Sequence, residues 1–104
     1  MAIFAKYNSE QKQVTIKVVG ELVFQERNSF VNAYQSQIEP VDIFVLDLSE
    51  TTFVDSSGLG MLLVLDDYAK DRKAKIVIMN PAPPALESLQ TANIHKLFEI
   101  VLPS

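Results

Sequence analysis

The segment DIFVLDLSETTFVDSSGLGMLL, residues 42–63, decides the fold of this chain. It opens with DIFVLDL, a nearly continuous apolar run as long as one strand, which is typical of a strand covered on both sides in the middle of a sheet. A loop is expected after Leu48. The motif Asp-Ser-Ser-Gly, residues 55–58, then meets apolar residues at helical spacing, so we predict a helix from Ser57 to about Arg72.

The segments on either side extend this strand and helix into a sheet. KIVIM (residues 75–79) predicts a second buried strand, and a strand, a helix and a strand in that order imply a right-handed crossover between parallel neighbours. Apolar periodicity and turn residues predict the remaining elements. These are a hairpin of strands at 2–7 and 13–19, a helix from Glu26 to Ile38, a short helix after NPAPP that ends near Asn93, and a last strand at 97–102. We therefore expect a single α/β domain over residues 1–104, with a mixed sheet of about five strands and three or four helices.

Composition and charge exclude several classes of function. The formal net charge is -4, and the nine Lys and Arg residues are scattered, which disfavours nucleic acid and anionic membranes because both call for a concentrated basic patch. No apolar segment approaches the roughly 18 residues that span a bilayer, and no signal peptide is evident, so we expect a cytoplasmic protein. The chain has no cysteine, and Asp42 and Asp47 have no histidine or second acid at ligand spacing. Neither a metal site nor a cofactor is predicted.

The Asp-Ser-Ser-Gly motif is first of all a helix cap, because Asp55 or Ser56 can accept a hydrogen bond from the unpaired amides of the first helical turn. A catalytic serine is disfavoured, since the Gly-x-Ser-x-Gly pattern is absent and the chain has a single histidine, His95. The glycines at 58 and 60 do not complete a dinucleotide or nucleoside triphosphate loop. Helix amides can still attract an anion, so a nucleotide-binding or other anion-binding module is an alternative. We do not expect an enzyme.

Phosphorylation is the remaining interpretation of the motif. A serine at the start of a helix is exposed, and a phosphate there meets amide donors and the positive end of the helix dipole. The fold should therefore tolerate phosphorylation, whereas a partner docked over the same place would be excluded. The residues alone do not choose between Ser56 and Ser57. On a helical wheel Leu59 and Leu63 lie beside the face that packs on the sheet, so they form either the rim of the core or an apolar contact patch. Gly60, between them, allows close approach to the helix backbone.

Three stretches occur together in one order: VVGEL (18–22), FVLDLSETTFVDSSGLGMLL (44–63) and IHKLFEIV (94–101). With them the chain resembles the STAS domain family, and in particular the single-domain bacterial anti-sigma factor antagonists of partner-switching systems. The resemblance implies a small protein that binds an anti-sigma factor with serine-kinase activity. The kinase phosphorylates the serine directly after the Asp, which ends the binding, and a serine phosphatase restores it.

The resemblance also implies which residues take part. The phosphorylated residue would be Ser56, flanked by Asp55, Ser57 and Gly58. The residues expected to bind the partner lie in the loop after the second strand and beside the serines: Gly20, Glu21, Leu22, Val23, Leu59, Gly60 and Leu63. Many family members continue Gly-Glu-Leu with an acid, whereas Val23 and Phe24 follow here. An output other than a sigma factor, in biofilm, secretion or stress signalling, is therefore an alternative.

Overall fold

The structure is a computed structural model that describes residues 2–103. Its strands are β1 (Ala2–Asn8), β2 (Gln13–Leu22), β3 (Ile43–Val54), β4 (Lys75–Met79) and β5 (Glu99–Val101). Its α-helices are α1 (Arg27–Gln35), α2 (Ser56–Asp71) and α3 (Pro83–Thr91), and two short 3-10 helices are η1 (Phe24–Glu26) and η2 (His95–Leu97). The predicted α/β architecture with a mixed sheet is confirmed.

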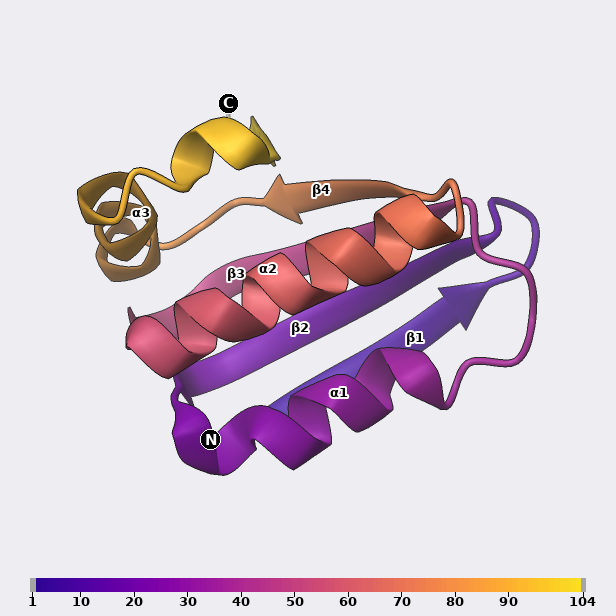
Figure 1. Ribbon diagram of the computed structural model, residues 1–104, viewed down its shortest axis with the longest axis horizontal. Coiled ribbons are helices and arrows are strands. Elements are labelled where there is room, and N and C mark those ends of the chain that lie inside the picture. The colour runs from indigo at the N-terminus through magenta and orange to yellow at the C-terminus, as the bar shows by residue number, and fades with distance from the viewer. Residues whose placement is uncertain (1, 104) are drawn as a thin grey trace.

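The sheet runs in the order β1-β2-β3-β4-β5, with β1 antiparallel to β2 and the other neighbours parallel (Figure 1). Each crossover moves one strand further in the same direction. Because such connections are right-handed, the connecting helices are laid on the same face of the sheet, where α1 and α2 lie side by side (Figure 1). Ion pairs occupy the opposite face, among them Lys75 with Glu99 at 3.1 Å between β4 and β5.

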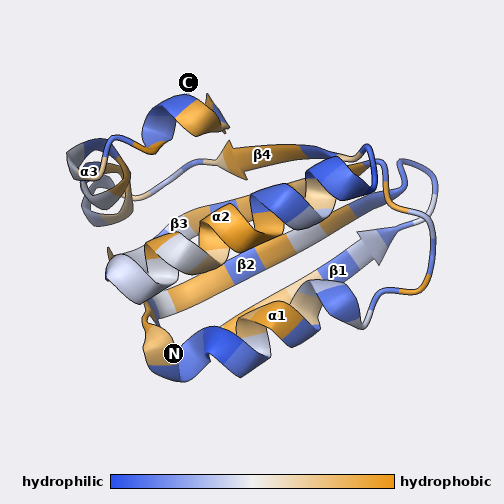
Figure 2. Ribbon diagram, in the orientation of Figure 1, coloured by the Kyte–Doolittle hydropathy of each residue, from blue (hydrophilic) through white to orange (hydrophobic). Residues whose placement is uncertain are grey.

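The core fills the space between the sheet and the helices. Val14, Ile16 and Val18 alternate along β2 and are buried, as the period of two in this strand predicts. Leu62 and Leu65 of α2 are fully buried against them. Figure 2 shows the hydrophobic residues gathered along β2, β4 and the middle of α2. Burial of each such side chain stabilises the fold by about 1.5–3 kcal/mol, so this layer holds α2 against the sheet.

Aromatic rings join the two neighbouring helices at the far end of α2. Tyr34 of α1 and Tyr68 of α2 meet edge to face with their centroids 4.8 Å apart. Phe44 of β3 approaches the Tyr68 ring at 6.0 Å, and the Arg72 guanidinium lies 3.5 Å above its centre. These contacts are favourable ring geometries that fix the crossing of α1 and α2.

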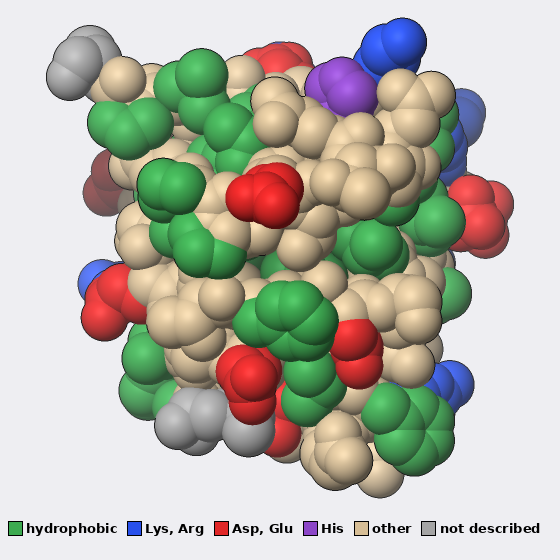
Figure 3. All heavy atoms as spheres, turned by 90° about the vertical axis from the view of Figure 1, so that its left-hand side faces the viewer, with side chains coloured by type: hydrophobic (Ala, Val, Ile, Leu, Met, Phe, Trp, Pro, Cys, Tyr) green, Lys and Arg blue, Asp and Glu red, His purple; other side chains and the backbone are tan. Residues whose placement is uncertain are grey.

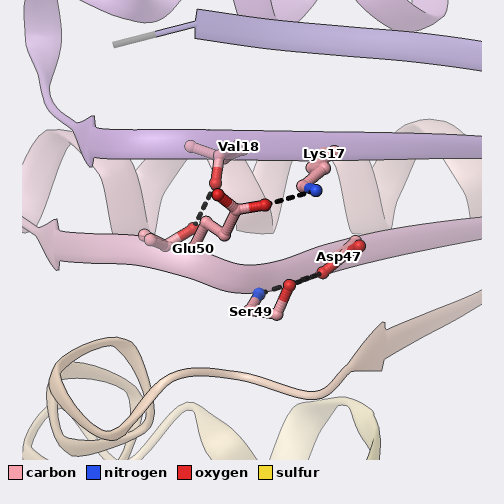
Figure 4. Close-up of polar contacts among 6 residues, drawn as sticks. Lys17, Val18, Asp47, Ser49 and Glu50 are labelled. Carbon is pink, nitrogen blue, oxygen red and sulfur yellow. Dashed lines mark hydrogen bonds and ion pairs between the residues drawn. The ribbon is translucent and has the colours of Figure 1, made fainter.

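The strand β3 is longer than predicted, since it continues to Val54 and replaces the loop expected after Leu48. Its second half pairs with the end of β2. A register shift leaves Val18 out of that pairing, and the buried Thr51 hydroxyl donates to the Val18 carbonyl oxygen at 2.9 Å. An ion pair between Lys17 and Glu50 joins the same strands (Figure 4). The polar residues of this segment therefore have strand partners that the sequence pattern does not reveal.

Two further predictions need correction. The loop expected at residues 20–22 is the end of β2, where Gly20 has a φ of 95° beside a register shift; only glycine adopts this conformation without strain. The first helix ends at Gln35, because the chain must return to β3, where the Asp42 amide donates to the Lys12 carbonyl oxygen. Ile38, predicted as the last residue of this helix, lies beyond its end and is 92% exposed.

The C-terminal elements follow the prediction closely. Pro83 and Pro84 occupy the first turn of α3, and Asn93 has a φ of 60° just beyond its end, as expected for a left-handed terminating residue. The last strand is shorter than predicted, because η2 takes up residues 95–97 before β5 begins.

Candidate functional site

Asp55 caps the helix α2. It has an extended backbone conformation, and its carboxylate oxygen Oδ1 accepts a hydrogen bond of 2.7 Å from the Gly58 amide. Ser56 is the first residue of the helix, one residue earlier than predicted, and Ser57 is the second. The predicted cap is confirmed, with Asp55 rather than a serine as the capping residue. The amides of Ser56 and Ser57 have no acceptor within the helix, as at any helix N-terminus.

Backbone contacts tie this cap to the end of β2. The Asp55 amide donates to the Leu22 carbonyl oxygen at 3.3 Å. A Cβ atom on Gly58 would lie 2.2 Å from that same oxygen and 2.9 Å from Cγ1 of Val54, so only glycine fits at this position. The Gly-Glu-Leu and Asp-Ser-Ser-Gly segments thus form one rigid unit, although they are far apart in the chain.

The two serines open onto different grooves. Ser56 is exposed and lines a groove of about 480 Å³ between α2 and α3, which we call the α2–α3 groove. Ser57 is half-buried and lines a groove of about 280 Å³ between α1 and α2, the α1–α2 groove. Neighbouring residues of a helix point about 100° apart, which explains the division. No hydrogen bond joins the Ser56 hydroxyl to any residue from 2 to 103.

The residues predicted to bind a partner have different surroundings. Leu59 is half-buried in the α2–α3 groove, and Leu63 is half-buried and packs against the core. Leu22 is fully buried, so its side chain cannot contact a partner directly. Its carbonyl oxygen accepts the hydrogen bond from the Asp55 amide and fits against Gly58. Gly20 is half-buried, Glu21 is exposed, and Val23 is half-buried.

Gly60 differs from Gly58 in its surroundings. A Cβ atom built on Gly60 would meet no described atom within 4 Å. The fold therefore does not require glycine there. Glycine in fact lowers stability, because a helix with glycine in its interior is less stable than the same helix with alanine by roughly 0.5–1 kcal/mol. The position lines the α1–α2 groove, where the absence of a side chain leaves the helix backbone open to close approach from outside.

Several exposed residues that line the two grooves were not predicted as site residues, among them Phe24, Val64, Phe53 and Glu87. Phe24 is 64% exposed and Val64 is 57% exposed, and both line the α1–α2 groove. Phe53, at 46% exposure, and Glu87 line the α2–α3 groove. The spacing of Val64 from Ser57 and Gly60, at seven and four residues, was a signal in the sequence for a shared helix face. Phe53 and Glu87 come together only through the docking of α3.

Acidic side chains lie among hydrophobic ones at this end of the molecule (Figure 3). Figure 3 views it from the side that carries the start of α2, and there Lys and Arg side chains lie only at the periphery. The single histidine, His95, belongs to η2 and does not line the groove of Ser56. No group of three His, Asp or Glu residues in the described range 2–103 could hold a metal ion. Within that range, no helix has the length and apolar character needed to cross a membrane.

Comparison with known sequences identifies relatives over nearly the full chain. A family model described as "Mlab, STAS domain" matches residues 5–102. A STAS-domain containing protein of Pseudomonas aeruginosa (strain UCBPP-PA14) is 35% identical over 100 residues, which make up 96% of this chain and 99% of the relative.

Solved structures share the fold. The anti-sigma factor antagonist SpoIIAA in its unphosphorylated form gives a TM-score of 0.70 at 17% identity, over 99% of this chain and 89% of SpoIIAA. Bacillus SpoIIAA in the phosphorylated form gives 0.65 at 22% identity, over 96% and 91% of the two chains. A sulfate transporter family protein from Wolinella succinogenes gives 0.78 at 11% identity, over 86% and 76%. At these identities the likeness establishes the fold alone.

Proposed function

This chain belongs to the STAS domain family, and we propose that it serves in partner switching as a phosphorylation-controlled binding switch. The unmodified protein binds an anti-sigma factor that is also a serine kinase, and this binding releases the target of that factor. The kinase transfers the γ-phosphoryl group of ATP to Oγ of Ser56, with release of ADP and a proton. Phospho-Ser56 no longer binds the kinase, and a serine phosphatase hydrolyses the phosphate to restore the first state.

The observation that carries this proposal is the environment of Ser56. The side chain is exposed at the first position of α2, and the cap depends on Asp55 and Gly58 rather than on the serine hydroxyl. A phosphate on Ser56 would therefore leave the cap intact while adding about -1.5 to -2 charges at the helix mouth. Bulk and charge at that point exclude a partner that packs over the mouth, and the domain stays folded.

We assign the kinase-binding surface to the α1–α2 groove and the adjoining helix mouth. The exposed side chains of Phe24 and Val64 supply apolar area there, and Gly60 leaves the helix backbone accessible between them. Exposed apolar side chains beside an accessible stretch of backbone are typical of a protein-binding surface.

Capture of the kinase by variants tests the switch. Ser56→Ala should bind the kinase as the wild type does, and Ser56→Asp should lose binding by at least tenfold. Ser9→Asp, in the exposed turn between β1 and β2, adds the same charge at the opposite end of the sheet from the start of α2 and serves as the control (Figure 1). Equal binding by Ser56→Asp and Ser56→Ala, with both folded, would contradict the switch. So would saturable nucleotide binding by the unmodified protein that Ser56→Asp does not change.

The position of the phosphate is tested by intact and fragment mass measurement after incubation with the kinase and ATP. We expect a single phosphate on Ser56, and none on Ser56→Ala. A phosphate found on Ser57 instead would refute the assignment.

The surface is tested by Phe24→Ser and Val64→Ser, each of which should weaken kinase capture by about tenfold, as expected for loss of a central apolar contact. Phe4→Ser is the matched control, because Phe4 is 59% exposed on β1 and lies on the face of the sheet away from the helices. Equal weakening by all three variants would show that the loss is not specific to the α1–α2 groove.

A further inference from the structure

The α2–α3 groove meets the kinase-binding surface only at the helix mouth, and beyond the mouth it has an acidic and aromatic lining of its own. The titratable side chains that line it are those of Asp55 and Glu87, and no Lys or Arg of the described chain lines it. The Asp55 carboxylate is engaged in the helix cap. Glu87 is exposed on α3 and forms no ion pair with residues 2–103, so its carboxylate is available to a cation from outside.

An exposed aromatic ring accompanies this free carboxylate. Phe53, at the end of β3, keeps 46% of its surface exposed, and Leu59 and Pro84 continue the apolar wall of the groove. An arginine side chain matches such a lining, since its planar guanidinium pairs with a carboxylate and stacks on an aromatic face, and its alkyl stem covers apolar surface.

Phosphorylation would strengthen this match. Ser56 lines the same groove, so a phosphate on its hydroxyl would add a dianion beside Glu87. The groove offers no cation of its own to neutralise the phosphate, in contrast to switches in which an internal arginine orders the modified segment. The charge therefore remains available to a second protein, and its sign favours a basic one.

We propose that the α2–α3 groove receives an arginine-bearing segment of the phosphatase, the protein that must select the phosphorylated form. The guanidinium pairs with Glu87 and the phosphate, and a neighbouring apolar side chain packs against Phe53 and Leu59. The inference rests on the proposed function and divides the surface between two partners. The kinase docks on the α1–α2 groove of the unmodified protein, where apolar side chains lie beside Arg27. The phosphatase binds the acidic α2–α3 groove of the modified protein.

The test uses a short capped peptide that alternates Arg and Leu, and the same peptide with each Arg replaced by Glu. Both are titrated into the ¹⁵N-labelled full chain and followed by amide chemical shifts. We expect the Arg peptide to shift amides at Phe53, Ser56 and Glu87, and to bind Ser56→Asp about threefold more tightly than the wild type. The Glu peptide should not bind. Shifts confined to other surfaces, or weaker binding to Ser56→Asp, would overturn the proposal.

Charge-reversal variants distinguish binding of the Arg peptide in this groove from a general attraction of the peptide to an acidic protein. Glu87→Lys should weaken binding of the Arg peptide about fivefold. Glu39→Lys makes the same charge change at an exposed position in the connection before β3, and it should have no effect. Equal weakening by both variants would overturn the proposal. If the reversed charge unfolds α3, Glu87→Gln takes the place of Glu87→Lys, and we expect it to weaken binding of the Arg peptide about twofold. Kinase capture by Ser56→Asp is an independent measurement, so a failure of the groove proposal can be distinguished from a failure of the switch.

Discussion

Two glycines of α2, two residues apart, should respond in opposite ways to the same substitution. Gly58→Ala forces a Cβ atom against the Leu22 carbonyl oxygen, a backbone atom that cannot move aside, and should cost about 3 kcal/mol of the free energy of unfolding. Gly60→Ala meets no described atom and should stabilise the domain by roughly 0.5–1 kcal/mol. Urea denaturation measures both. A similar loss in the two variants would show that helix propensity or packing at Gly60 has been misjudged.

Gly60→Ala has a second expected effect that stability cannot explain. If the kinase packs against the bare backbone in the α1–α2 groove, the added methyl group should weaken kinase capture in a protein that is more stable than the wild type. Kinase capture unchanged by Gly60→Ala would mean that the partner does not approach the helix at this point.

The cap can be tested separately from the serines. Asp55→Ala removes the acceptor of the Gly58 amide and should destabilise the domain by about 1 kcal/mol. Asp55→Asn keeps an oxygen at the same position and should recover most of that loss. Thermal or urea unfolding gives the comparison, and equal losses in the two variants would contradict the role of the side chain as the cap.

At the scale of elements, the second half of β3 depends on one buried hydroxyl. Thr51→Val keeps the shape of the side chain but removes the donor to the Val18 carbonyl oxygen, and should cost about 1 kcal/mol. The neighbouring Thr52 is exposed, so Thr52→Val is the control and should be nearly neutral in urea denaturation. A neutral Thr51→Val would mean that the register shift in β2 does not need this bond.

The contact between α1 and α2 predicts a dependence on alkaline pH. Burial, with a smaller effect of the nearby Tyr68, raises the pKa of Tyr34 above its ordinary value of 10.0, and Arg27 opposes this. The folded protein thus holds this proton more tightly than the unfolded chain does. The resulting stabilisation is complete below pH 10 and is lost as pH rises through the folded pKa. The free energy of unfolding of Tyr34→Phe should therefore fall less steeply above pH 10 than that of the wild type. Parallel curves would contradict this.

The spacing of apolar residues in the sequence predicted those helices and strands whose formation depends mainly on their own residues. The helix α2 and the strand β4 were placed within one residue, because a buried helix face and a short apolar strand are visible in the chain itself. The residues SETTFV of β3 lack such a run, and they become a strand because β2 lies beside them. The motif predicted the cap, but the separation of Ser56 from Ser57 into two grooves depends on where α1 and α3 dock.

At the scale of the whole molecule, a negative charge at Ser56 should change binding without changing the fold. The helix dipole favours the charge, whereas Asp55 and Glu87 oppose it, so the free energy of unfolding of Ser56→Asp should lie within about 1 kcal/mol of the wild type. Amide chemical shifts should differ only near the start of α2, the ends of β2 and β3, and α3. Shifts spread through β1 or the far end of α2 would indicate a conformational change instead.

The tight contact between Gly58 and the Leu22 carbonyl oxygen also limits the length of this segment. One residue inserted after Asp55 would turn Ser56 toward the groove beside α1 and place Ser57 where only glycine fits. Substitutions of side chains around Ser56 should therefore be tolerated far better than the gain or loss of a residue in this segment. In a descendant of this gene, a single codon gained here would do more damage than most substitutions nearby.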